Sequence, residues 1–200
     1  MSKPGLYALT FLLVMSVASM VTSSEVRKTY SNNDYRFTFD YPSSYDVKGL
    51  SKWYFDLLSD GKILLRGSVE DNTIKIFINE SKPQKDIFIA FARERVRVVC
   101  GADGPDGSSY CEKIKSERAY TTGNGLYVLE FNLTLTREDY VRKTKQTSTA
   151  GPVYMVDISR TNKPLALMIF PDYGHLASES TEQLAREIIE TINLGDVARK

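Results

Sequence analysis

The stretch Tyr35-Arg36-Phe37-Thr38-Phe39-Asp40-Tyr41-Pro42 decides the fold of this chain. Aromatic side chains occupy every second position, and polar residues stand between them. Because successive side chains of a strand point to opposite faces, this alternation is typical of a strand with one buried face. Pro42 ends the pattern, since proline has no N–H to donate to a neighbouring strand. We expect residues 35–41 to form the first strand of an antiparallel sheet.

Similar runs of alternating apolar and polar residues recur along the chain. Asp60-Gly61 and Asn124-Gly125 separate pairs of such runs, and both dipeptides favour hairpin turns. The run 165–170 is continuously apolar, which is typical of a strand near the centre of a sheet, and the long run 127–135 should also be central. Together the patterns predict strands at 53–57, 63–69, 74–79, 112–121, 127–135, 154–158 and 165–170.

Two segments carry apolar residues at the three- and four-residue spacing of a helix face. The first spans about residues 83–99, with Ser81 as a cap and Pro83 in its first turn. The second begins with a capping box of Ser180 and Gln183 and ends at Gly195. Its predicted core face is Leu184, Ala185, Ile188, Ile189 and Ile192. Four strands, a helix, four strands and a helix indicate an α+β fold, an antiparallel sheet flanked by helices.

Residues 1–23 have the features of a secretory signal peptide. Lys3 precedes an apolar run of 16 residues, from Leu6 to Val21, and small residues follow. The alternative is a transmembrane anchor, which needs about 20 apolar residues. We expect cleavage after Ser23, export to the periplasm or the outside of the cell, and no stable membrane anchor afterwards. Residues 24–200 then form a single domain.

The charge balance argues against a general binder of nucleic acids or anionic membranes. Of the 26 basic residues, Lys3 lies in the signal segment, which leaves 25 against 25 acidic residues. Binding to polyanions requires an excess of basic residues on the surface. We therefore expect no nucleic-acid partner, although a local basic patch is compatible with this balance.

Cys100 and Cys111 suit an exported protein, because oxidising compartments preserve disulfides. The segment between them is short and rich in Gly, Asp and Pro, so we expect a surface loop closed by a disulfide. The alternatives are two free thiols or a metal pair. A metal site requires further Cys or His ligands nearby, and His175 is the one histidine of the chain.

Three features resemble the PsbP-like domain. They are the aromatic strand ending Phe37-x-Phe39-x-Tyr41-Pro42, the strand with Trp53 that follows, and the helix Glu187-Ile188-Ile189-Glu190-Thr191-Ile192. This domain is shared by the extrinsic PsbP subunit of photosystem II, the Ran-binding Mog protein and many exported bacterial proteins of unknown role. The resemblance covers residues 33–194, although the family often has Gly where Tyr35 stands. It implies an α-β-α sandwich and no particular activity, since members of the family differ in function.

Candidates for catalysis are few. His175 is the one side chain that titrates near neutral pH without a perturbing environment, and Asp172 stands three positions before it. A hydrolase also needs a nucleophile, and the chain has no Gly-x-Ser-x-Gly elbow. Ser59 and Lys62 match the Ser-x-x-Lys spacing, but Asp60-Gly61 between them indicates a hairpin turn.

Two loops carry the remaining candidates for binding. Asp103, Asp106, Ser108 and Glu112 offer oxygen atoms of the kind that calcium prefers, without the spacing of an EF-hand. Residues 138–151 are expected to be an irregular loop, with a basic cluster around Tyr140 that either docks a partner or is simply solvated. The cluster consists of Arg137, Arg142, Lys143 and Lys145.

Taken together, these features favour an exported, non-catalytic accessory domain that binds a protein or a small ligand through its loops, without a cofactor or metal. The alternative function is a small extracytoplasmic hydrolase using His175 and Asp172.

Overall fold

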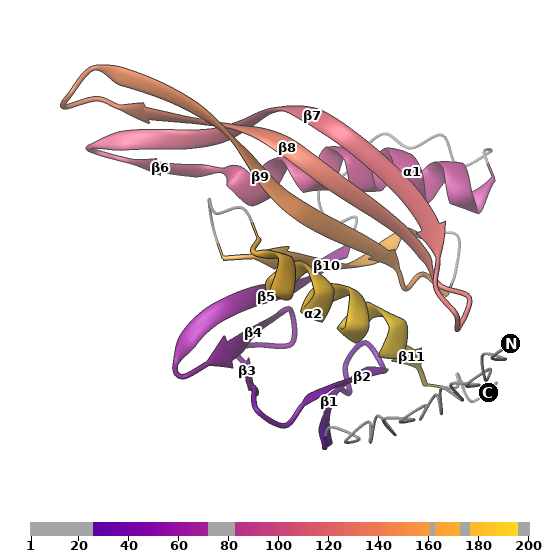
Figure 1. Cartoon of the computed structure of the whole chain (residues 1–200). Coiled ribbons are helices and arrows are strands. Elements are labelled where there is room, and N and C mark those ends of the chain that lie inside the picture. Colours follow the sequence, from indigo (N-terminus) through magenta and orange to yellow (C-terminus); the bar gives the residue numbers. More distant parts are fainter. Residues whose placement is uncertain (1–25, 72–82, 161–162, 173–176, 196–200) are drawn as a thin grey trace, which may run out of the picture.

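The computed structural model describes residues 26–71, 83–160, 163–172 and 177–195 (Figure 1). The signal segment 1–23, the strand expected at 74–79, the cap Ser81 and His175 lie outside these ranges. In chain order the elements are β1 (Arg27–Asn32), β2 (Phe37–Pro42), β3 (Asp46–Gly49), β4 (Tyr54–Ser59), β5 (Lys62–Asp71), α1 (Gln84–Arg95), the 3-10 helix η1 (Val96–Cys100), β6 (Ala102–Gly104), β7 (Gly107–Thr121), β8 (Tyr127–Asp139), β9 (Thr144–Asp157), β10 (Leu165–Pro171), α2 (Glu179–Thr191) and β11 (Asn193–Leu194).

Most strands form one antiparallel sheet of eight strands, in the order β3-β4-β5-β10-β9-β8-β7-β6. Strand β10 lies next to the middle of this order, as its continuous apolar run predicts. Strand β8 is the third from the β6 edge, so the expectation of a central position for 127–135 is only approximately met. Strand β7 lies beside the edge, as expected for 112–121, because its neighbour β6 is only three residues long.

The sheet separates two apolar cores. On one face of β10, Leu167 and Ile169 pack in the core that α2 completes. On the other face, Ala166, Met168 and Phe170 pack in the core that α1 and η1 complete. A strand with both faces buried needs apolar residues at every position, which explains the run at 165–170. The expected α+β fold, with helices on both faces of an antiparallel sheet, is confirmed.

The aromatic stretch 35–42 contains β2, with Phe37 and Phe39 fully buried and Tyr41 nearly so. Two details of the prediction are wrong. The strand starts at Phe37, because Arg36 has a φ of 54°, in the left-handed region outside strand geometry. It is also the second strand, and it belongs to a separate sheet of three strands, β1-β2-β11.

Strand β1 was not predicted, because five of its six residues are polar and it shows no apolar alternation. The predicted hairpin between β4 and β5 is confirmed. Ser59 pairs with Lys62 across the turn, and Asp60 and Gly61 both have a positive φ, of 49° and 75°. Positive φ at both central residues is the geometry that an Asp-Gly pair favours.

The first predicted helix is observed in two parts. Regular helix α1 ends at Arg95, and the chain continues as η1 to Cys100. Pro83 lies just before α1 rather than in its first turn. Within the described residues, no helix is long and apolar enough to cross a membrane.

All five residues of the predicted core face are buried, four of them in α2 and the fifth, Ile192, directly after the helix. Its ends differ from the prediction. The cap is Ser178, whose side chain accepts a hydrogen bond from the backbone N–H of Thr181 at 3.2 Å, and Ser180 lies inside the helix. At the other end Ile192 is extended, and the chain continues into β11, which pairs with β2. Gly195 therefore follows a strand and does not cap the helix.

Candidate functional site

Strands β7, β8 and β9 continue beyond the apolar cores. Leu135 is the last residue of β8 that packs in a core, yet β8 runs on to Asp139 and pairs with Thr144 of β9 across a tight turn. The β6–β7 hairpin lies alongside, with Gly107 opposite Asp139. We call residues 102–111 and 135–148 the arm. Figure 1 shows both of its hairpin tips projecting past η1.

Residues 101–110 were expected to be a surface loop and residues 138–151 an irregular loop, and both segments are largely strands. The segment 101–110 contains β6 and the start of β7, and the segment 138–151 contains the end of β8 and half of β9. These strands were missed because they have polar residues on both faces: residues 144–148 are all exposed. The period-two signal requires one buried face, so a hairpin outside the core shows no such signal.

The fold brings the two candidate segments together. The backbone N–H of Tyr140, at the tip of the β8–β9 hairpin, donates to the carbonyl of Asp106, at the tip of the β6–β7 hairpin, at 2.9 Å. Between the hairpins is a shallow hollow of about 420 Å³. Its lining consists of Ala102, Asp103, Gly104, Asp106, Gly107, Ser108, Ser109, Arg137, Glu138 and Asp139.

Two cations of the basic cluster have acidic partners on the arm. The ammonium of Lys145 lies 3.5 Å from Glu138 and donates to the phenol oxygen of Tyr110 at 3.0 Å. The hydrogen bond to Tyr110 raises the pKa of Lys145, and Glu138 adds to this effect. The backbone N–H of Arg142 donates to Asp139 at 2.8 Å, and its guanidinium lies 3.8 Å from the same carboxylate. The tip is therefore a surface of mixed charge rather than a purely basic patch.

The most exposed apolar side chains of the arm are at the apex of the β8–β9 hairpin. Tyr140 is 49% exposed and Val141 is 72% exposed. Large apolar groups in contact with water are unfavourable and are characteristic of surfaces that bind other molecules when they are grouped. The sequence singled out Tyr140 only as a neighbour of the basic cluster, and gave no sign that Val141 lies at an apex.

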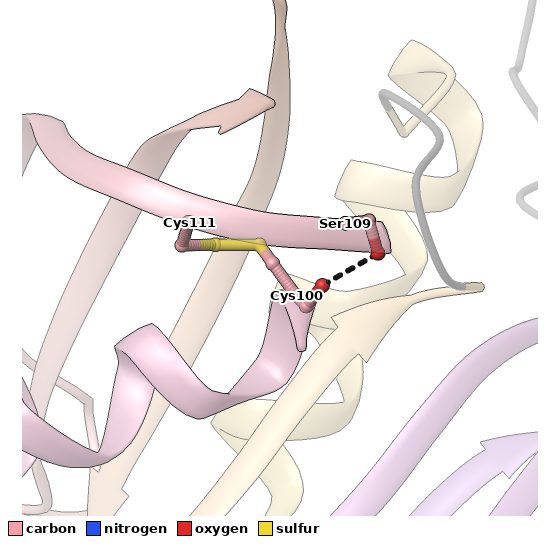
Figure 2. The surroundings of a disulfide bond; sticks show 3 residues. All are labelled: Cys100, Ser109 and Cys111. Atoms are coloured by element: carbon pink, nitrogen blue, oxygen red, sulfur yellow. Dashed lines mark hydrogen bonds between the residues drawn. A yellow bond between two sulfur atoms is a disulfide. The ribbon is translucent and has the colours of Figure 1, made fainter. Parts of the chain in front are cut away.

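A disulfide closes the base of the β6–β7 hairpin. Cys100 ends η1, and Cys111 lies in β7 with its Cα atom 5.2 Å away, so the predicted pairing is confirmed. Beside the bond, the hydroxyl of Ser109 donates to the carbonyl of Cys100 at 2.8 Å (Figure 2). The hairpin is thereby fixed to η1, which packs in the core under α1. Fixing a binding element in advance reduces the entropy that it loses on binding.

The oxygen atoms proposed for calcium do not converge. Asp103, Asp106 and Ser108 line the hollow, whereas Glu112 lies outside it. Across the described ranges, no group of three or more His, Cys, Asp and Glu side chains is arranged to hold a metal ion. The arm therefore offers no calcium cage among the residues that the structure describes.

The residues considered for hydrolysis are placed elsewhere. Asp172 follows β10, and its carboxylate accepts a hydrogen bond from the guanidinium of Arg66 at 2.9 Å. Arg66 also lies 3.3 Å from Asp56, so Asp172 belongs to an ion-pair network on the sheet. Ser59 and Lys62 flank the β4–β5 turn, as the hairpin interpretation predicts. His175 lies outside the described residues.

The chain matches no protein-family model and no curated protein. The solved structures to which it is similar include the following three. Cyanobacterial PsbP (CyanoP) from Synechocystis is 12% identical, with 90% of this chain and 99% of that chain covered and a TM-score of 0.43. The Ran-binding protein Mog1p of Saccharomyces cerevisiae is 11% identical, with 86% and 97% covered and a TM-score of 0.41. A protein of Bacteroides thetaiotaomicron is 14% identical, with 86% and 50% covered and a TM-score of 0.34.

PsbP and the Ran-binding Mog protein are also the proteins that the sequence resemblance names. Identities in this range bear on the fold alone and transfer no activity.

One prediction concerns the contact between the two hairpins. A Cβ atom on Gly107 would lie 2.2 Å from the backbone carbonyl oxygen of Glu138. We expect Gly107→Ala to separate the β6–β7 hairpin from β8 and to destabilise the protein by about 1–3 kcal/mol, the usual cost of overpacking. Hydrogen exchange should become faster for the amides of residues 102–109.

Gly104→Ala is the matched control, because Gly104 pairs with Gly107 across the same hairpin. A Cβ atom on Gly104 would be 3.8 Å from the nearest atom, an ordinary contact. Equal exchange rates in the two variants would contradict the proposed packing of the tip.

Proposed function

We propose that this chain is an exported, non-catalytic accessory domain that binds a protein partner through the apex of the arm. The observation that carries the proposal is the position of Tyr140 and Val141, 49% and 72% exposed, at the end of strands that extend beyond the core. Beyond Leu135, which packs in the core, β8 and β9 continue for four further paired positions, from Thr136↔Thr147 to Asp139↔Thr144. The pairing of this outer part brings the apex of the hairpin away from the core.

The composition of the tip supports a protein partner over a small ligand. Pockets for small molecules are concave and enclose most of the ligand, whereas the hollow between the hairpins is shallow and lined mainly by Gly, Asp and Ser. Protein interfaces place an apolar, often aromatic centre inside a polar rim. Tyr140 and Val141 supply such a centre, and the paired charges of Glu138, Asp139 and Lys145 supply the rim.

Export is part of the proposal. The disulfide supports it, because bonds of this kind persist in oxidising compartments and are rare in the cytosol. N-terminal sequencing of the native protein should find a chain that begins after Ser23. A chain that still carries Met1 in a membrane fraction would show that the segment is an anchor.

The test of the arm uses a photo-crosslinking amino acid at position 141, in the protein expressed in its native compartment. Position 26 is the matched control, because Val26 is also a valine and is 71% exposed, against 72% for Val141. We expect a discrete crosslinked protein from position 141 that is absent from position 26. Excess parent protein should compete for this product, and the double variant Tyr140→Thr/Val141→Ser should not.

The same crosslinks from both positions, or equal competition by parent and double variant, would contradict a partner site at the apex. The hydrolase alternative is tested separately. The purified protein is assayed against a panel of esters and phosphoesters, and any activity that disappears with His175→Ala would replace the accessory function by a catalytic one.

A further inference from the structure

A second exposed surface lies at the opposite edge of the large sheet from the arm. The chain between β3 and β4 makes a turn at residues 50–53, and the side chain of Tyr35 packs beside it. Leu50 and Tyr54 are each 52% exposed. We call the group of Tyr35, Leu50, Lys52, Trp53 and Tyr54 the aromatic turn.

The backbone of the aromatic turn is held at several points. Its Leu50 N–H donates to the carbonyl of Tyr54 at 2.9 Å, and the N–H of Val69 in β5 donates to the carbonyl of Trp53 at 2.8 Å. The amide of Asn32, a residue only 6% exposed, donates to the carbonyl of Lys52 at 3.0 Å. Neighbouring strands therefore hold Leu50 and Tyr54 in place, although water surrounds much of both side chains.

The ring of Trp53 connects the members of the group. It lies 5.1 Å from the ring of Tyr35, measured between centroids, and the ammonium of Lys52 lies 5.0 Å from the Trp53 centroid. Burial, reinforced by the charges of Asp71 and Asp34, raises the pKa of Tyr35 to about 12. The phenol is thus neutral at physiological pH, and the aromatic turn combines neutral aromatic rings with one cation.

The charges around the turn have an asymmetric distribution. From Val47 to Phe55 the sequence has two lysines, Lys48 and Lys52, and no acidic residue. Asp46, just before this segment, lies 3.4 Å from Lys28 of β1. The segment 47–55 therefore carries positive charge, whereas the acidic residues that act on Tyr35, Asp34 and Asp71, lie outside this segment.

The residue types distinguish a lipid surface from a protein partner. Interfaces between proteins favour Trp, Tyr and Arg, and are poor in Leu and Lys at their energetic centre. Trp and Tyr beside Lys, with an exposed Leu, are the residues that occupy the headgroup region of a bilayer. The aromatic turn exposes Leu50 as well as Tyr54, and between Val47 and Phe55 it has two lysines and no arginine.

We propose that the aromatic turn inserts into the headgroup region of a phospholipid bilayer. Leu50 and Tyr54 enter the interface, Trp53 lies at its level, and Lys48 and Lys52 contact lipid phosphates. This is a reversible contact of a peripheral protein, because so few apolar side chains do not anchor a protein permanently.

Trp53 provides the measurement, because it is the one tryptophan in the chain. The protein without residues 1–23 is mixed with vesicles of phosphatidylcholine alone or with added phosphatidylglycerol. We expect cofloatation with both, more with the anionic vesicles, together with a shift of Trp53 emission to shorter wavelength. Lipids brominated near the headgroup should quench this emission. Emission that does not respond to any of these vesicles would overturn the proposal.

The double variant Leu50→Ser/Tyr54→Thr removes the inserting groups and keeps a residue with high strand propensity at position 54. We expect its partitioning onto vesicles to fall roughly tenfold, since two half-exposed apolar side chains lose their favourable transfer. Tyr140→Thr/Val141→Ser is the matched control, because it makes the same kinds of change at similarly exposed residues on the arm.

The control should bind vesicles as the parent does, but it should not compete for the protein that crosslinks to position 141. The two surfaces can therefore be tested independently. Vesicle binding that needs anionic lipid but is unchanged in Leu50→Ser/Tyr54→Thr would show general charge attraction, and would overturn the proposal. Loss of vesicle binding in Tyr140→Thr/Val141→Ser, rather than in Leu50→Ser/Tyr54→Thr, would also overturn the proposal.

Discussion

Replacing Phe39 by alanine is expected to lower the free energy of unfolding by about 3–5 kcal/mol, the range for a buried Phe changed to Ala. Phe39 is 0% exposed. Its ring centroid lies 5.0 Å from that of Tyr30 and 5.2 Å from that of Phe55. Tyr30 belongs to the small sheet and Phe55 to the large one, so Phe39 connects the two sheets and its loss leaves a cavity between them.

The measurement is urea unfolding followed by Trp53 fluorescence, with the midpoint and slope compared between variants. Thr38→Ala is the matched control, because Thr38 directly precedes Phe39 in β2 and its side chain points to the other, half-buried face. We expect less than about 1 kcal/mol for this change. Similar losses in both variants would mean that the alternation in β2 does not mark the core.

The alternation in residues 37–41 predicted this core because each apolar side chain of a strand is found where that individual position faces away from water. A large apolar side chain such as that of Phe39 is stabilising where water is excluded, so the pattern of apolar residues indicates the buried face. The same reasoning located β10, and also the inner face of α2, from Leu184 to Ile189, with Ile192 directly after it. Strand β2 and helix α2 pack in one core, and β10 packs in both.

Elements held mainly by backbone pairing did not leave this signal. Strand β1 is ordered by six paired positions with β2, although most of its side chains are exposed. The outer part of β9 is ordered in the same way by β8. Backbone hydrogen bonds are nearly independent of side-chain type, so a polar strand beside an established strand cannot be distinguished from a loop by hydrophobic pattern.

The two segments of the candidate site could be predicted from the sequence, but their contact in the folded protein could not. The sequence marked both the Gly- and Asp-rich segment before Cys111 and the basic segment after Arg137. Their contact depends on the register of β7 against β8, which sets Gly107 opposite Asp139. Two bulges shift this register, between Cys111 and Lys113 and between Ile114 and Ser116, and local residue patterns do not specify where such shifts occur.

The second large effect concerns the disulfide at the base of the arm. We expect Cys100→Ala/Cys111→Ala to lower the free energy of unfolding by about 3 kcal/mol, mainly because the unfolded chain is no longer restricted. This is a large share of the usual stability of about 5–15 kcal/mol, yet the fold should persist, because both apolar cores remain. In the double variant, hydrogen exchange should accelerate relative to the parent more for the amides of residues 102–111 than for those of β10.

Ser109→Ala is the control for this joint, since it removes the hydrogen bond to the Cys100 carbonyl and leaves the disulfide intact. We expect it to cost about 1 kcal/mol, the typical net contribution of one hydrogen bond. Mass spectrometry of the unreduced, unfolded parent should find no thiol that can be alkylated. Two reactive thiols there, or equal stability of the parent and the double cysteine variant, would refute the structural role of the bond. A smaller loss from Ser109→Ala than from the cysteine pair would show that the covalent link, rather than the local packing, holds the arm to η1.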